Sequence, residues 1–364
     1  MSKIAIFLSD LLGGGAERVM LNLASGFVDR GYMVDLVLAK KEGSYISQIP
    51  DKIKVVDLKA TSLLGSTSLL SRYLKSARPT ALFSALEDTN IVAISAKQLA
   101  RVKIPLIVTV HNNLSQESAN ATSLKRKFVP YLTPWFYPLA DTVVAVSHGV
   151  ADDLVRLGLR QNKLAIIYNP IVTPELVQRL KDPLEHSWFA PQEPPVIVGV
   201  GRLNQQKDFP TLIKAFAKVR QQQPAWLIIL GEGEERPHLE SLVKELDLTD
   251  AVALPGFVDN PYIYMRDAAV LVLSSAWEGF GNVLVEAMAA GTPVVSTNCK
   301  SGPAEILADG EYGRLVPVGD SEAMAKAIAI ALKQPYENQL LQSRAFNFSL
   351  EKAVDEYLKL IPAL

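Results

Sequence analysis

The sequence predicts an α/β protein of two domains, each built on a doubly wound parallel sheet. Three observations lead to this fold class. At 364 residues the chain is too long for one ordinary core and long enough for two. Short apolar runs alternate with helical segments almost throughout, as in parallel sheets joined by crossover helices. A proline-rich segment at 171–195 divides the alternation into two series, and we interpret it as an irregular hinge.

The apolar runs give the expected strands in chain order. The first series comprises Lys3–Ser9, Val34–Ala39, Lys54–Leu58, Ala81–Leu86, Leu106–His111, Thr142–Ser147 and Leu164–Tyr168. The second series comprises Val196–Gly201, Trp226–Gly231, Val252–Pro255, Ala269–Leu273, Pro293–Thr297 and Arg314–Val318. We therefore predict domains over 1–170 and 171–346 and a last helix over 347–364. Ligands of such sheets bind outside the carboxyl ends of the strands, so the loops that follow strands matter most.

Composition narrows the class of protein. The net charge of −1 gives no sign of nucleic-acid binding. Residues 1–170 carry 20 Lys and Arg against 13 Asp and Glu (+7), and the rest carry 17 against 25 (−8). The basic half suits an anionic partner such as a membrane surface or a phosphorylated acceptor, and a chance imbalance explains it equally well. Cys299 is the only cysteine and the first apolar run stops at Asp10, so we expect a cytoplasmic protein without a signal peptide.

The stretch from Ser274 to Thr297 carries the clearest chemistry. An apolar strand leads into a loop with two glycines, and a helix begins near Asn282. Amide groups at a helix start form a cradle for phosphate oxygens. Glu278 and Glu286 would repel phosphate, so they are better suited to bind hydroxyl groups. A ligand with both phosphates and hydroxyls is a nucleotide sugar, although glutamate in the first turns of a helix is also common for structural reasons.

This stretch resembles the Glu-x7-Glu motif of the retaining glycosyltransferases of family 4. The residues in register are Glu278, Gly279, Phe280, Gly281, Glu286, Ala287, Gly291, Pro293 and Val294. The resemblance implies the GT-B fold, in which two Rossmann-like domains face each other across a cleft and the last helix returns to the first domain. It also implies that Glu286 holds the ribose hydroxyls and Glu278 the sugar hydroxyls. The nucleotide sugar would further contact the loop and helix start, which comprise Gly279, Phe280, Gly281, Asn282 and Val283.

Other loops of the second series fit the same ligand. Arg202 and Lys207 follow a strand and offer two positive charges, which match a nucleotide diphosphate. They resemble the Arg-x4-Lys pair that steadies the leaving diphosphate in the family. Gly231 and Gly233 permit close approach of backbone to a nucleotide. The resemblance places the backbone of Phe257 and Val258 at the edge of the base.

The first series opens with a glycine loop, Gly13 to Gly15, before a helix from Ala16 to about Asp29. A dinucleotide fingerprint fails here because Arg18 stands where it needs glycine or alanine, and Asp35 lies within the second strand. The loop instead resembles the family's N-terminal glycine loop, which implies that Gly14 and Gly15 face the donor diphosphate across the cleft and help to shape the acceptor side. His111 ends a strand, where a lone histidine is often structural. The resemblance places His111 near the transferred sugar.

The segment at 123–140 combines cations with aromatic residues. Lys125, Arg126 and Lys127 precede five aromatic residues between Phe128 and Tyr137. This combination suits contact with a membrane surface, and a solvated basic face backed by core aromatics explains it as well. Prolines at 130, 134 and 138 argue against one continuous helix. Family members with lipid-linked acceptors carry similar segments, which favours peripheral attachment to the inner face of the plasma membrane.

We therefore predict a retaining, metal-independent glycosyltransferase in which Glu278, His111, Arg202 and Lys207 act on the reacting groups. The four histidines lack ligand spacing and no Asp-x-Asp occurs, so we expect no metal and no cofactor apart from the donor substrate. We favour a UDP-sugar with a hexose or N-acetylhexosamine, and a GDP-sugar remains open. The acceptor would be a glycan or a lipid-linked glycan of the cell surface. The alternatives are a non-catalytic protein that binds nucleotide sugars and a GT-B sugar-nucleotide epimerase.

Overall fold

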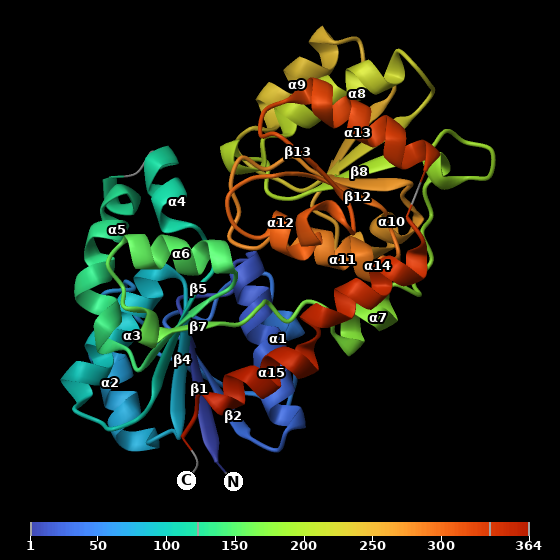
Figure 1. The fold of residues 1–364 in the computed structure, drawn as a ribbon. Helices are drawn as coiled ribbons and strands as arrows, with labels where there is room; N and C mark the ends of the chain where they lie inside the picture. Colours follow the sequence, from blue (N-terminus) through green and yellow to red (C-terminus); the bar gives the residue numbers. More distant parts are fainter. Residues whose placement is uncertain (1, 122–123, 335, 363–364) are drawn as a thin grey trace. The chain divides into compact units, whose positions relative to one another are not determined.

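The computed structural model describes residues 2–121, 124–334 and 336–362. The chain forms two compact units, one of residues 1–170 with 350–364 and the other of residues 171–349. Each unit contains one sheet, and the strands pair in parallel throughout the described residues. Figure 1 shows both sheets with helices on their two faces.

The first unit has a seven-stranded sheet in the order β3-β2-β1-β4-β5-β6-β7 within the described residues. Its strands are β1 (Lys3–Leu8), β2 (Met33–Leu38), β3 (Lys54–Asp57), β4 (Ala81–Ala85), β5 (Leu106–Val110), β6 (Thr142–Ala145) and β7 (Leu164–Ile166). The central strands are buried on both faces, which explains why they read as continuous apolar runs. The order reverses between β1 and β4, so the topological switch point of this sheet lies there.

Seven α-helices cover this sheet in the described part of the first unit. They are α1 (Gly15–Asp29), α2 (Ser66–Ala77), α3 (Glu87–Ala100), α4 (Leu114–Asn120), α5 (Leu124–Phe136), α6 (His148–Arg156) and α15 (Leu350–Lys359). Figure 1 shows α1 and α15 on one face and α2 and α3 on the other. Phe83 of β4 contacts Phe27 of α1 at a ring distance of 5.2 Å and Tyr357 of α15 at 5.9 Å. These aromatic contacts anchor the last helix on this unit.

The second unit has a six-stranded sheet in the order β10-β9-β8-β11-β12-β13 within the described residues. Its strands are β8 (Val196–Val200), β9 (Trp226–Leu230), β10 (Val252–Gly256), β11 (Val270–Leu273), β12 (Val294–Thr297) and β13 (Arg314–Val316). Its helices are α7 (Pro174–Arg179), α8 (Phe209–Arg220), α9 (Arg236–Glu245), α10 (Pro261–Asp267), α11 (Asn282–Ala290), α12 (Pro303–Ile306), α13 (Ser321–Lys333) and α14 (Asn338–Ala345). In Figure 1, α8, α9 and α13 cover one face and α10, α11 and α14 the other.

The strands occur in the predicted order, and each end lies within two residues of the prediction. The last helix differs: it begins at Leu350 rather than Asn347, because Ser349 is extended and bridges to Val172. The proline-rich segment at 171–195 is not irregular throughout, since it contains α7. Thr173 caps this helix by accepting the amide of Leu176 at 3.1 Å, and Pro174 occupies the first turn, where its missing N–H costs nothing.

Candidate active site

The candidate site of the second unit lies at the carboxyl ends of β8 and β11. These strands are neighbours at the switch point of the sheet, because the chain passes from β8 outward to β9 and from β11 to β12 on the other side. The loop after β8 carries Lys207 and the loop after β11 carries Glu278. The Nζ atom of Lys207 lies 2.5 Å from Oε1 of Glu278. The fold thus joins two predicted site residues in one ion pair.

Neighbouring hydroxyl groups hold this pair in place. Ser275 donates to the same Oε1 atom of Glu278 at 2.6 Å, and Ser274 donates to the carbonyl of Lys207 at 2.7 Å. Thr297, at the end of β12, donates to the carbonyl of Ser275 at 2.6 Å. The Glu278 carboxylate is only 7% exposed. Because both contacts use Oε1, the second oxygen of Glu278 is available to accept from a ligand hydroxyl.

Cys299 is buried close to this pair. Burial and, to a lesser extent, the nearby charge of Glu278 together raise the pKa of its thiol to about 12. The thiol is therefore in its neutral form at physiological pH.

Arg202 lies in the loop after β8 with an exposed side chain, and it has no ion-pair partner among the described residues. Two predicted glycines support this loop. A Cβ atom on Gly231 would lie 1.9 Å from the carbonyl oxygen of Gly201, and one on Gly233 would lie 2.2 Å from that of Leu203. Neither distance is sterically possible. The close backbone approach that these glycines permit here is to the Arg202 loop. The amide of Leu203 in that loop donates to the carbonyl of Glu232, between the two glycines, at 2.8 Å.

The helix α11 begins directly after the Glu278 loop. Gly281 precedes it with a φ of +104°, a conformation that strongly favours glycine. Gly281 has no side chain that could cap the helix. The amides of Asn282 and Val283 therefore lie at the positive end of the helix dipole without a side-chain cap from Gly281. Glu286 lies one turn beyond Asn282 on the same face and is half-buried. The first amides of α11 and the Glu286 carboxylate therefore lie about one helical turn apart.

The remaining predicted residues of this unit flank the loops already described. Gly279 and Phe280 connect Glu278 to Gly281, and Phe280 is 2% exposed. Phe257 and Val258 follow β10, the strand at the edge of the sheet beyond β9. The Phe257 ring is 62% exposed, which leaves a flat apolar surface at that edge. Among the described residues, no cluster of three or more His, Cys, Asp and Glu side chains has the geometry of a metal site.

In the first unit, Gly14 and Gly15 form the start of α1 after β1. A Cβ atom on Gly14 would lie 2.3 Å from a carboxylate oxygen of Glu17, which is 9% exposed. The Glu17 carboxylate is thus folded over the first turn of the helix. A negative group in this place disfavours a phosphate and favours a ligand that donates hydrogen bonds, such as a sugar with free hydroxyls.

His111 is the first residue after β5. Its Nε2 atom is buried and has no hydrogen-bond partner among the described residues. Burial lowers the pKa of the imidazole to about 4, so the ring is neutral at physiological pH. A buried ring nitrogen without a partner carries a desolvation cost, which a ligand hydroxyl would relieve.

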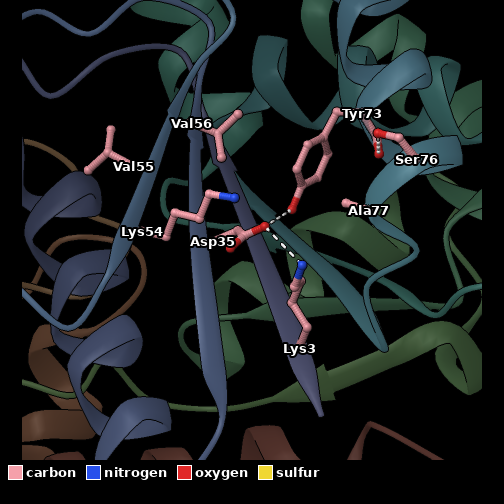
Figure 2. A pocket seen from close by; sticks show the side chains of 8 residues that line it. All are labelled: Lys3, Asp35, Lys54, Val55, Val56, Tyr73, Ser76 and Ala77. Atoms are coloured by element: carbon pink, nitrogen blue, oxygen red, sulfur yellow. Dashed lines mark hydrogen bonds and ion pairs between the residues drawn. The ribbon is translucent and has the colours of Figure 1, made fainter. Parts of the chain in front are cut away.

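A hollow of about 390 Å³ opens at the opposite, amino edge of the same sheet (Figure 2). Asp35 lies within it and accepts a hydrogen bond from Tyr73 at 2.8 Å, and the ammonium of Lys3 lies 3.7 Å away. Asp35 thus has its hydrogen-bond and charge partners within the protein, near the start of β2 and away from the glycine loop that follows β1. It is therefore not placed to bind a ribose beside that loop, as the sequence predicts from the missing dinucleotide-binding fingerprint.

The helix α5 is continuous from Leu124 to Phe136 although Pro130 and Pro134 lie inside it. The expectation that prolines interrupt the helix is therefore wrong for Pro130 and Pro134, since a proline removes one N–H···O bond and the others remain. It holds for Pro138, because α5 ends at Phe136 and a separate 3-10 turn, Tyr137–Leu139, follows. The side chains of Lys125 and Arg126 lie outside the described ones. Lys127, Tyr131 and Trp135 are exposed at intervals of four residues, with Tyr131 71% and Trp135 78% exposed. No described helix is long and apolar enough to cross a membrane.

The structure also identifies residues that the sequence analysis missed. Ser275 and Thr297 lie within the stretch from Ser274 to Thr297, and Gly201 ends an expected strand, but the sequence indicates no role for any of the three. A Cβ atom on Gly201 would lie 3.1 Å from the Lys207 side chain, so glycine makes room for that lysine. The signal for Ser275 is weak, because a serine after a strand is ordinary loop chemistry.

Comparison with known proteins identifies the family of the chain. Residues 13–174 match the family described as Glycosyltransferase Family 4, and residues 181–347 match Glycosyl transferases group 1. The chain is 31% identical over 377 aligned positions to the N-acetylgalactosamine-N,N'-diacetylbacillosaminyl-diphospho-undecaprenol 4-alpha-N-acetylgalactosaminyltransferase of Campylobacter jejuni, with 99% of each chain covered.

Two solved structures share the architecture. Sucrose-phosphate synthase of Thermosynechococcus elongatus superposes with a TM-score of 0.83 at 21% identity, covering 99% of this chain and 98% of that one. HepE of Anabaena, in complex with UDP and glucose, gives a TM-score of 0.79 at 22% identity, with 100% of both chains covered. Two doubly wound units and these neighbours define the GT-B fold. The chain belongs to glycosyltransferase family 4, and the protein is a glycosyltransferase.

Proposed function

We propose that the protein is a retaining glycosyltransferase that moves an N-acetylhexosamine from a UDP-sugar to a lipid-linked glycan. The observation that carries the proposal is the Lys207–Glu278 pair beside the exposed Arg202 and the start of α11. This arrangement offers cations to a diphosphate and carboxylates to hydroxyls within one unit. The Campylobacter relative, aligned over its whole length, is named for transfer of N-acetylgalactosamine to a diphospho-undecaprenol-linked sugar, which supports both substrate classes.

The site suits a donor that arrives as an anion. Without ligand, Lys207 neutralises Glu278, whereas Arg202 has no such partner. A bound diphosphate would give both cations a doubly charged partner, and the amides of Asn282 and Val283 would complete its binding. These groups stabilise the leaving diphosphate without a metal ion in the proposed reaction. Glu286 would bind the ribose hydroxyls and the free oxygen of Glu278 the sugar hydroxyls.

In the proposed reaction, the bond between the sugar anomeric carbon and the diphosphate oxygen breaks as the acceptor oxygen bonds to the same face of that carbon. The acceptor proton passes to the leaving diphosphate oxygen, so the anomeric configuration is retained and UDP is released. His111 is neutral and would hydrogen-bond the transferred sugar rather than act as a charged acid. The side of α1 that carries Gly14, Gly15 and Glu17 would bind hydroxyls of the acceptor.

The acceptor class implies a place at the cytoplasmic membrane surface. Lys127, Tyr131 and Trp135 share one exposed face of α5. We propose that this face, with the neighbouring Lys125 and Arg126, binds anionic lipid headgroups and inserts its aromatic rings at the interface. A lipid-linked acceptor would then be presented from the same surface to which the enzyme is attached.

The test is ligand-induced stabilisation followed by product analysis. Thermal unfolding is recorded with UDP, GDP, ADP and NAD, each in the presence of EDTA, because a ligand of the native state raises the melting temperature. We expect stabilisation by UDP. Turnover is then measured with UDP-N-acetylhexosamines and a polyprenyl-diphosphate disaccharide, and the anomeric configuration of the product is read by NMR. Stabilisation by GDP alone would replace the donor, and an inverted product would refute retention.

A further inference from the structure

The chain passes between the two units at two places, after Pro170 and after Ser349. These two passages are bonded to each other inside the second unit. The carbonyl of Phe348 accepts hydrogen bonds from the amides of Ile171 at 3.0 Å and Val172 at 3.1 Å. Ser349 and Val172 form an isolated parallel bridge at the same point. A movement of one passage therefore displaces the other, and both are attached to Phe348.

The side chain of Phe348 contacts the loop that carries Glu278. Its ring lies 5.4 Å from the ring of Phe280, edge to face at 71°, and both rings are 2% exposed. Phe280 is two residues after Glu278. Its backbone is close-packed against Gly302, because a Cβ atom on Gly302 would lie 1.8 Å from the Phe280 carbonyl oxygen. Phe280 thus contacts both the Phe348 ring and the turn before α12.

Arg344 completes this cluster. Its guanidinium lies 5.3 Å from the Phe348 ring centre and donates to the carbonyls of Glu305 at 2.6 Å and Ile306 at 2.9 Å. Glu305 and Ile306 belong to α12, which follows the Gly302 turn. The ring of Phe348 is therefore packed between a fixed cation and a fixed aromatic, and densely packed interiors transmit displacement rather than absorb it.

We propose that Phe348 is a positioning residue that couples the two chain passages to the Glu278–Gly281 loop. This inference rests on the proposed function, since that loop is where the donor nucleotide would bind. When UDP fixes the loop, the Phe280–Phe348 contact transmits the restraint to the amides of Ile171 and Val172. By thermodynamic reciprocity, a conformation of the passages that displaces Phe348 weakens UDP binding. Donor binding and the junction of the two units are thereby linked without a ligand contact at the junction.

The test is amide hydrogen exchange of the full-length protein with and without UDP, read at residues 171–172 and 279–283. In the native protein we expect UDP to slow exchange in both regions, because exchange reports local opening. In Phe348→Leu, UDP should still protect 279–283 but lose its effect at 171–172, and its dissociation constant should rise by about fivefold or more, the lower range of site-to-site coupling. Phe346→Leu is the matched control, since that ring lies two residues earlier and is 56% exposed.

The outcomes separate the two proposals. Protection at 279–283 without any change at 171–172 in the native protein would overturn the coupling and leave the proposed donor site intact. Full protection of both regions in Phe348→Leu would also overturn it. If none of UDP, GDP and ADP protects 279–283, the proposed function fails and this inference fails with it. Arg344→Gln provides a second variant, because it removes the guanidinium from the Phe348 ring, and it should uncouple the two regions in the same way as Phe348→Leu.

Discussion

Lys207 and Glu278 are 71 positions apart in the chain, yet their charged atoms lie 2.5 Å apart. They meet because β8 and β11 are neighbours at the point where the strand order reverses, so that their following loops converge. Removal of one partner leaves the other buried and unneutralised, since the side chains are 18% and 9% exposed. The pair is therefore a structural element of the candidate site as well as the centre of the proposed function.

Substitution of either member should therefore abolish transfer. Lys207→Ala removes the cation that would stabilise the leaving diphosphate, and Glu278→Ala removes the hydroxyl-binding carboxylate. We expect turnover to fall by about a hundredfold or more in each, the range for loss of one preorganised electrostatic contact. Each single variant should also lose about 3 kcal/mol of unfolding free energy from the unpaired partner. Turnover is measured with UDP-sugar, and unfolding free energy by urea denaturation.

The control for this prediction is Lys218→Ala. Lys218 pairs with Glu322 in the same unit, but both side chains are largely exposed at 39% and 57%. Such a surface pair contributes less than about 1 kcal/mol, so this variant should keep its turnover and its stability. Near-normal turnover in Lys207→Ala or Glu278→Ala would show that the site assignment is wrong. In the double variant Lys207→Ala with Glu278→Ala no unpaired charge stays buried. Its unfolding free energy should therefore regain most of what each single variant loses.

The neutral state of His111 gives a pH dependence of stability. Burial lowers its pKa from 6.5 to about 4, so the unfolded chain binds a proton in this window that the native protein does not. The free energy of unfolding should therefore fall as the pH drops from 6.5 toward 4, by up to about 3 kcal/mol from this group. His111→Asn should reduce that slope. His238→Asn, at a side chain that is 62% exposed, should leave it unchanged. Equal slopes in all three proteins would contradict the assignment.

The hollow at the amino edge gives a prediction that separates stability from activity. Tyr73→Phe removes the hydrogen bond to Asp35, a buried carboxylate, and should cost about 2 kcal/mol of unfolding free energy. Ser76→Ala, on the rim of the same hollow, removes only a bond to a backbone carbonyl and should cost less. Turnover at a temperature well below unfolding should be normal in both. A loss of turnover in Tyr73→Phe would assign this hollow a functional role.

The sequence was most informative where local pattern and fold agree. Buried strands are short apolar runs bounded by turns, which is why every strand was predicted close to its observed ends. The cap of α6 is local in the same sense, since Ser147 accepts the amide of Val150 at 3.1 Å. The family motif located Glu278 and Glu286, but the ion pair with Lys207 depends on strand order, which no local pattern contains.

Three features were beyond local pattern for physical reasons. The start of α15 was misplaced because Ser349 is held extended by pairing with Val172, which is distant in the sequence. The continuity of α5 was missed because proline lowers helix propensity without forbidding a helix whose other contacts suffice. The contacts of Gly231 and Gly233 were unpredictable, since a glycine allows close approach without showing what approaches it.

The exposed face of α5 predicts binding to anionic membranes. Trp135 and Tyr131 present two large rings to solvent beside Lys127, and each basic residue near an anionic surface adds about 1 kcal/mol of attraction. The protein should co-sediment with vesicles of phosphatidylcholine and phosphatidylglycerol in roughly equal parts, and added salt should weaken the binding. Tyr131→Ser with Trp135→Ser should lower vesicle affinity about tenfold or more, whereas Phe346→Ser, an exposed ring in the other unit, should not. Turnover on a short water-soluble acceptor should survive the double substitution, because these side chains belong to none of the loops that carry the donor site. Equal affinity of the double variant and the native protein would show that α5 does not face the lipid.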